Sequence, residues 1–191
     1  MKMYLTIIGI CVLMIAPMIT MACYTPYLVA LGLTIFAVIL VILVDALIAT
    51  IARLLPKKCA NHEFKVFTVS SKEKKFYEKL KIRKWKDKVP EIGHFTGFRK
   101  NKIVDPKSVE YLDRFLLEIC YGEIGHFFSL FFGFAILLIY PIHHAWLAIS
   151  VPVAIINIFF NLPSLLILRY NSYKLASLRI INLRKQQRQA A

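Results

Sequence analysis

The sequence lacks the short motifs that mark the common hydrolases and nucleotide-binding enzymes. It contains no G-x-S-x-G, no H-E-x-x-H and no P-loop. Its four cysteines, Cys11, Cys23, Cys59 and Cys120, form no C-x-x-C pair and no set with metal-ligand spacing. We therefore expect free thiols, no metal and no cofactor, and any group transfer to proceed without a covalent enzyme intermediate.

Acidic residues are also scarce, with 11 Asp and Glu against 25 Lys and Arg, although 58% of the residues are hydrophobic. The two properties are separated along the chain, because four apolar runs occupy residues 4–20, 27–52, 127–140 and 145–168. A membrane-spanning helix needs about 20 apolar residues. The second and fourth runs are long enough, and the first is marginal. The third must extend back to about Gly122 or forward through 141–144.

Basic residues are absent from the two short turns at 21–26 and 141–145. Between Arg53 and His126 there are 18, six follow Leu168, and Lys2 precedes the first run. Positive residues remain on the cytoplasmic side of a membrane. We therefore predict a multi-pass protein of the cell membrane, with both termini and the long loop cytoplasmic. Alternatively, the first run is a signal peptide cleaved near Cys23.

The predicted fold class is an all-α membrane protein with four transmembrane helices arranged as two hairpins. We expect the first hairpin at 1–52, and at 53–121 a cytoplasmic and interfacial loop with amphipathic helical segments. A second hairpin at 122–168 and a basic cytoplasmic tail at 169–191 follow.

The loop carries a basic segment, Lys72 to Lys88, with nine Lys and Arg among seventeen residues. Its aromatic residues need burial or an interface. Basic side chains with aromatic rings are typical of segments that bind anionic lipid headgroups. We expect no nucleic-acid partner, because the chain has no recognisable RNA- or DNA-binding module.

Asp105 and Pro106 predict the start of a helix covering about 106–121, with Asp105 as its N-cap. An apolar stripe follows at Val109, Leu112, Leu116 and Ile119. The pattern continues into the third run, as one helix or as two joined at Gly122 or Gly125. Glu123 and His126 then share a helix face at the membrane boundary. A carboxylate beside an imidazole is the usual way to orient a general base, and capping or snorkelling is the alternative.

The fourth run carries a polar stripe of Ser150, Asn157 and Ser164, with Ala154 and Asn161 on the same face. Such a stripe predicts helix packing in lipid, or the lining of a headgroup or acyl pocket. We expect Pro163 to kink this helix.

Asp45, inside the second run, needs a partner, and Arg169 is the natural choice. The pentapeptide EIGHF occurs at 91–95 and again at 123–127, but its flanks are unrelated, so we interpret the repetition as coincidence. His94 of the first copy is a further candidate for the same site.

Three blocks carry a family resemblance: Trp85–Gly93 running on to Arg99 and Lys100, then Glu118, Glu123 and His126–Phe127, then Asn161–Pro163 and Arg169–Leu175. In order and spacing they resemble the CrtO-like glycosyl-4,4'-diaponeurosporenoate acyltransferases, which are small bacterial membrane enzymes. The chain departs from the family pattern at Tyr121, Phe127 and Leu168.

The resemblance implies transfer of a fatty acyl group from a cytosolic thioester, linked to CoA or a carrier protein, to a hydroxyl of a glycosyl carotenoid or other glycolipid. It also implies the site residues. The catalytic set is His126, Glu123, Glu118 and Asp87, and the substrate-binding set is Trp85, Lys86, Lys100, Asn161, Arg169, Tyr170 and Asn171.

In this scheme His126 is the general base, oriented by Glu123 or Glu118. Lys86, Arg169 or Asn161 supplies donors to the oxyanion. One alternative is a non-catalytic scaffold that docks anionic lipid or a partner protein through the basic loop. Another is a lipid-modifying hydrolase that uses His126 and the acids, with or without a metal.

Overall fold

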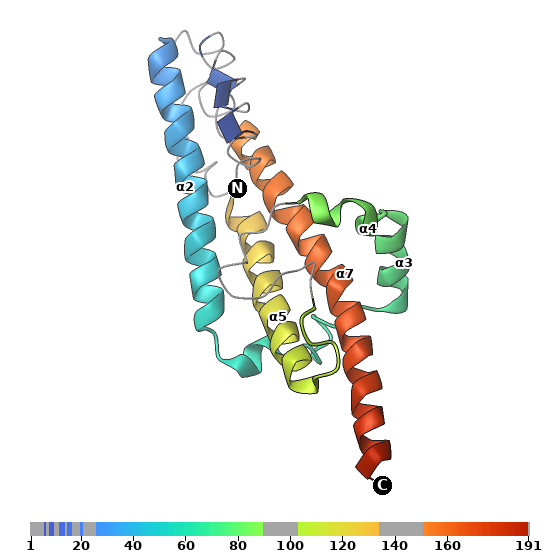
Figure 1. Ribbon diagram of the computed structural model, residues 1–191. Helices are drawn as coiled ribbons and strands as arrows, with labels where there is room; N and C mark the ends of the chain where they lie inside the picture. Colours follow the sequence, from blue (N-terminus) through green and yellow to red (C-terminus); the bar gives the residue numbers. More distant parts are fainter. Residues whose placement is uncertain are drawn as a thin grey trace. The chain divides into compact units, whose positions relative to one another are not determined.

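The computed structural model describes residues 26–89, 103–133 and 151–190, together with eight positions between 6 and 20. The described part contains helices and turns but no strand (Figure 1). Three of its helices are long and apolar enough to cross a membrane, which supports a membrane protein. The third predicted run is only partly described, because residues 134–150 lie outside this part. The eight early positions are all helical.

The chain forms two compact units. Unit 1 comprises residues 1–50 and 125–162, and unit 2 comprises 51–124 and 163–191. Each unit is therefore built from segments that are distant in the sequence.

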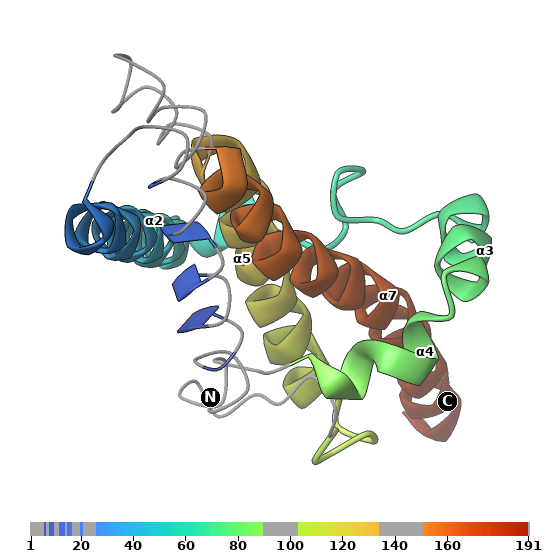
Figure 2. The same cartoon turned by 90° about the horizontal axis from the view of Figure 1, so that it is seen from above.

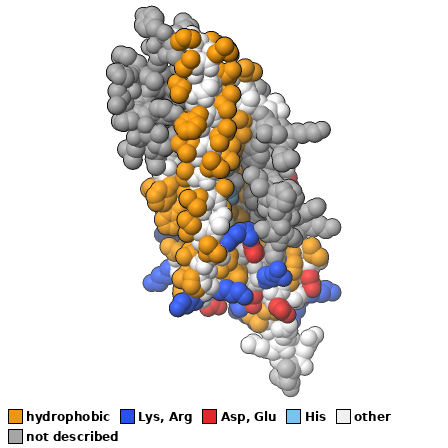
Figure 3. Space-filling model, turned by 90° about the vertical axis from the view of Figure 1, so that its left-hand side faces the viewer, with side chains coloured by type: hydrophobic (Ala, Val, Ile, Leu, Met, Phe, Trp, Pro, Cys, Tyr) orange, Lys and Arg blue, Asp and Glu red, His pale blue; other side chains and the backbone are white. Residues whose placement is uncertain are grey.

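The helix α2, Tyr27–Leu54, has 28 residues, of which only Asp45 and Arg53 are charged. At 1.5 Å per residue, about 20 residues already cross the roughly 30 Å hydrocarbon core. Hydrophobic side chains cover its exposed face for most of its length (Figure 3). Pro56 lies two residues after the end of the helix, where its fixed φ and missing N–H oppose continuation.

The helix α5, Val109–Phe132, is one uninterrupted helix of 24 residues, so neither Gly122 nor Gly125 breaks it. Its predicted start at Pro106 was wrong by three residues. Asp105 Oδ1 accepts the N–H groups of Lys107 and Ser108, which forms a turn, and Ser108 Oγ caps the helix by accepting from Tyr111 N. Ser108, rather than Asp105, therefore caps α5, and Asp105 stabilises the turn before it.

The helix α7, Val151–Ala190, has 40 residues and contains Pro163. The segment from 169 onward, expected as a tail, continues this helix. In unit 2 the apolar stripe of α5 packs on α7, where Leu112, Leu116 and Ile119 meet Leu168 and Leu175. This contact confirms that the predicted stripe faces a core.

The basic loop folds into short helices: η1 Lys57–Ala60, α3 Ser71–Lys79, α4 Ile82–Trp85 and η2 Lys86–Lys88. Lys81, in the left-handed conformation with φ 52°, forms the turn between α3 and α4. Tyr77 and Ile82 pack with Ile167 and Tyr170 of α7. Both ribbon views show α3 and α4 beside α7 (Figures 1 and 2). Within unit 2 the loop is therefore anchored to α7 by its own apolar residues.

Candidate active site

His126, on α5 in unit 1, is half-buried, and its Nδ1 lies 2.8 Å from Oδ1 of Asn161 on α7. Hydrogen bonds from the NH₂ group of Asn161 fix the orientation of its side-chain amide. Its Nδ2 donates to Asp45 Oδ2 at 2.9 Å and to Asn157 Oδ1 at 2.8 Å. Because only the NH₂ group can serve these acceptors, the oxygen of the amide faces the imidazole.

This arrangement assigns the tautomer of His126. An amide oxygen only accepts hydrogen bonds, so Nδ1 of the imidazole carries the proton and the ring lone pair is on Nε2. In many enzymes a general-base histidine is oriented by a hydrogen bond from one ring nitrogen to another side chain, and its second nitrogen takes the proton. The geometry therefore provides a proton acceptor of fixed orientation within apolar helices.

Asp45 of α2 accepts from Asn161 through Oδ2, whereas its Oδ1 is buried and has no hydrogen-bond partner among the described residues. The expected partner of Asp45, Arg169, was wrong: Asp45 bonds an amide, and Arg169 bonds other carboxylates. Three helices thus supply one chain of contacts, from carboxylate to amide to imidazole.

Asn157, one helical turn before Asn161 on α7, supports this chain of contacts. It is 1% exposed, and its Nδ2 donates to the carbonyl oxygen of Ser129 at 3.0 Å. A Cβ atom placed on Gly133 would overlap the Asn157 amide. Glycine at 133 therefore leaves room for the amide that fixes Asn161.

Replacing Gly133 with alanine is expected to lower the free energy of unfolding by about 1–3 kcal/mol, because the new methyl group must displace a buried, hydrogen-bonded side chain. The measurement is an SDS titration of the purified protein in mild detergent. Gly32→Ala is the matched control, because Gly32 has nothing within 4 Å of an added Cβ and sits in α2. There alanine gains about 1 kcal/mol of helix propensity. Equal effects of the two substitutions would contradict the crowding at Asn157.

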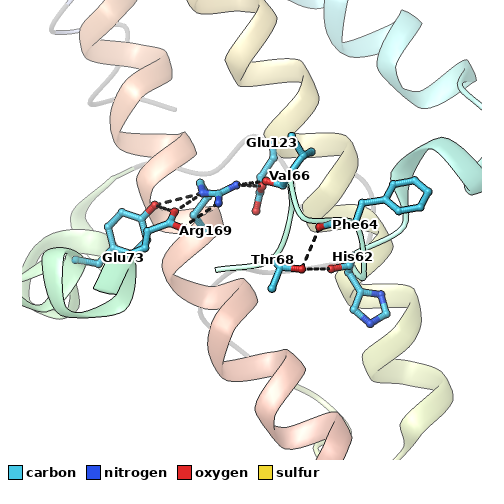
Figure 4. Close-up of polar contacts among 8 residues, drawn as sticks. His62, Phe64, Val66, Thr68, Glu73, Glu123 and Arg169 are labelled. Atoms are coloured by element: carbon cyan, nitrogen blue, oxygen red, sulfur yellow. Dashed lines mark hydrogen bonds and ion pairs between the residues drawn. The ribbon is translucent and has the colours of Figure 1, made fainter. Parts of the chain in front are cut away.

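Unit 2 holds a second polar cluster, centred on Arg169 of α7 (Figure 4). Its Nη1 donates to Glu123 Oε2 of α5 and to the Val66 carbonyl oxygen, both at 2.9 Å. On the opposite side, Nε lies 2.6 Å from Glu73 Oε1 and Nη2 lies 3.1 Å from Glu73 Oε2. The guanidinium thus binds two carboxylates and joins the loop and α3 to the two long helices.

Glu73 is positioned by a local sequence signal. Ser70 caps α3 by accepting from Glu73 N, and the Glu73 carboxylate bonds back to the Ser70 backbone, which completes a capping box. Burial raises the pKa of Glu73, but hydrogen bonds from Arg169 and Tyr77 outweigh it, so the net pKa is lowered. Burial and the Glu73 carboxylate together raise the pKa of Tyr77, whose hydroxyl donates to Glu73.

Four of the five N–H groups of Arg169 are used by these acceptors. Glu123 is 3% exposed, and its Oε1 has no hydrogen-bond partner among the described residues. The geometry favours a structural role for Arg169 over that of an oxyanion donor.

A comparison with protein families matches residues 60–180 to the model described as glycosyl-4,4'-diaponeurosporenoate acyltransferase, CrtO. The chain belongs to the CrtO family. The match covers more than half of the sequence and includes His126, Asn161 and Arg169. No curated protein and no solved structure matches the chain.

In this CrtO-family chain the remaining predicted site residues that the structure describes lie in unit 2. Glu118 forms an ion pair with Arg53 at 3.2 Å without hydrogen-bond alignment. Trp85 Nε1 donates to the Leu80 carbonyl oxygen, Lys86 is half-buried and Asp87 is exposed. Tyr170 is buried, and the Lys174 ammonium lies 4.7 Å from the centre of its ring. Asn171 is also buried. Lys100 and His94 lie outside the described residues.

Glu123 and His126, which we predicted as a pair, belong to different units. Glu123 accepts from Arg169 in unit 2, and His126 contacts Asn161 in unit 1. Among the described residues, no group of three His, Cys, Asp or Glu side chains could hold a metal ion. The sequence interpretation missed Asn157 as a support and Glu73 as a partner of Arg169. For Glu73 a signal existed, because Ser70-x-x-Glu73 is a capping-box pattern.

Proposed function

We propose that this chain transfers a fatty acyl group from a cytosolic thioester to a hydroxyl of a lipid-linked sugar, a glycosyl carotenoid or another glycolipid. The proposal rests chiefly on the His126–Asn161 contact, which orients an imidazole within the apolar helices of a CrtO-family chain. A hydroxyl is a weak nucleophile at neutral pH, and a positioned general base typically accelerates its reaction by about 10²–10⁴-fold.

In the proposed reaction, Nε2 of His126 takes the proton of the acceptor hydroxyl. At the same time the hydroxyl oxygen bonds to the carbonyl carbon of the thioester. When the tetrahedral intermediate collapses, the carbon–sulfur bond breaks and the leaving thiolate takes a proton from the imidazolium. The products are an ester and a free thiol. The transfer is direct, and no enzyme side chain becomes acylated.

The proposed topology has four membrane helices in two hairpins, with both termini and the loop in the cytoplasm.

The α3 surface suits both an anionic donor and anionic headgroups. Its lysines 72, 75 and 79 are exposed, and Phe76 and Leu80, four residues apart, are 52% and 40% exposed. A basic helix with an exposed apolar pair is typical of a membrane interface.

Lipid mass spectrometry tests the proposal. Membranes that contain a glycosyl carotenoid are compared with and without the intact chain, after supply of an acyl thioester. We expect a new species heavier than the glycoside by one esterified fatty acid, formed only with the intact chain. An unchanged lipid profile would contradict the proposal and favour the non-catalytic scaffold, which docks lipid or a partner through the basic loop.

A further inference from the structure

Asp45 is the only charged side chain among the described residues of unit 1, and His126 is the only histidine among them. The described residues of unit 1 contain one further titratable side chain, that of Tyr27 at the start of α2. A carboxylate within a membrane-spanning segment is costly and is a functional candidate by default. The single carboxylate and the single imidazole are joined through one amide, that of Asn161.

The residues around this chain are apolar. On α2, Ile42, Leu43 and Leu47 are 51%, 60% and 60% exposed, so this surface suits lipid rather than water. In such surroundings a charge acts over longer distances than in water. The nearest charged groups along the other two helices, Glu123 and Arg169, belong to unit 2 and bind one another there.

From these contacts we propose that Asp45 positions His126 and stabilises its imidazolium through the Asn161 amide. The proposal rests on the acyl transfer proposed above. When His126 takes the hydroxyl proton, the Asn161 oxygen accepts from Nδ1–H while its NH₂ group donates to the carboxylate, so the amide is polarised toward the new positive charge. Asp45 lies outside residues 60–180, which match the family. The proposed role of Asp45 therefore makes the helix α2 part of the active unit in this chain.

The first test is the pH dependence of acyl transfer in two variants. In Asp45→Asn the carboxylate charge is lost, so the rate should fall roughly 10- to 100-fold, the range found for carboxylates that orient histidines at metal sites. The acidic limb of the pH–rate profile should also move to lower pH, because the imidazolium is less stabilised. In Asn161→Asp a carboxylate contacts Nδ1 directly, and the acidic limb should move to higher pH.

Asp113→Asn is the matched control, because Asp113 bonds Arg179 in unit 2 and is remote in sequence from this chain of contacts. It should leave the pH profile unchanged. If Asp45→Asn keeps the unaltered profile, or Asn161→Asp moves it in the same direction as Asp45→Asn, the positioning role of Asp45 is overturned.

The second test does not need activity. Nitrogen-15 NMR of histidine-labelled protein in detergent reports which ring nitrogen carries the proton, and His126→Gln identifies the signal. We expect a dominant Nδ1–H tautomer that shifts toward Nε2–H in Asp45→Asn. An Nε2–H tautomer in the unmodified chain would overturn this inference. Absence of acyl transfer in the unmodified chain with the expected tautomer would instead overturn the proposed function.

Discussion

Replacing His126 with glutamine is expected to lower the rate of acyl transfer by about 10²–10⁴-fold, the range usual for loss of a general base. Glutamine keeps a polar side chain of similar reach, and its NH₂ group can still donate to Asn161 Oδ1. It cannot take a proton at neutral pH. The loss should therefore appear in kcat, with little change in KM for the donor. The measurement is initial-rate formation of the acylated glycolipid in proteoliposomes.

His62→Gln is the matched control for this substitution. His62 lies in unit 2, outside the chain of contacts from Asp45 to His126, and its carbonyl oxygen accepts from Thr68 at 3.4 Å. The control should retain the rate of the unmodified chain. Equal losses in the two variants, or an active His126→Gln enzyme, would show that the imidazole of His126 is not the base.

Replacing Arg169 with leucine is expected to lower the free energy of unfolding by about 3–5 kcal/mol, the usual effect of removing one partner from a buried ion pair. Two carboxylates lose their counter-ion, and the Glu123 side chain is only 4% exposed. The measurement is the midpoint of SDS unfolding in mild detergent, followed by tryptophan fluorescence.

Arg179→Leu is the control for Arg169→Leu, because the two arginines lie on the same helix and are 21% and 20% exposed. Their partners differ. Arg179 pairs with Asp113 and Glu63, which are 42% and 65% exposed, so its loss should have an effect of about 1 kcal/mol or less. Equal effects in the two variants would mean that the burial of Glu123 does not determine the energy of the cluster.

The same cluster predicts acid sensitivity. Because the pKa of Glu73 is lowered on folding, its contribution to stability is present above the ordinary value of 4.5 and is lost as pH falls through the lowered value. Arg169→Leu removes the main partner of Glu73 and should remove this part of the pH dependence. Unfolding midpoints measured at pH values from above 4.5 downward test whether stability falls with falling pH.

Much of the architecture could be predicted from local patterns. Long apolar runs predict membrane helices because each backbone polar group must be satisfied within its own segment. The stripe at Leu112 and Leu116 predicted the buried face of α5 because helical spacing alone places these residues together. The start of α5 was misplaced because Asp105 and Ser108 both suit a cap, and only the folded backbone selects Ser108.

The sequence by itself determined that the chain is helical, rich in membrane-spanning segments, and similar to one acyltransferase family. These properties depend on composition, short-range periodicity and ordered motifs. Only the tertiary structure decided that Asp45 bonds Asn161 and that Arg169 bonds Glu73 and Glu123. The physical reason is that each buried charge must find a partner in space, and the choice depends on which helix faces pack together, over separations of 46 to 116 residues.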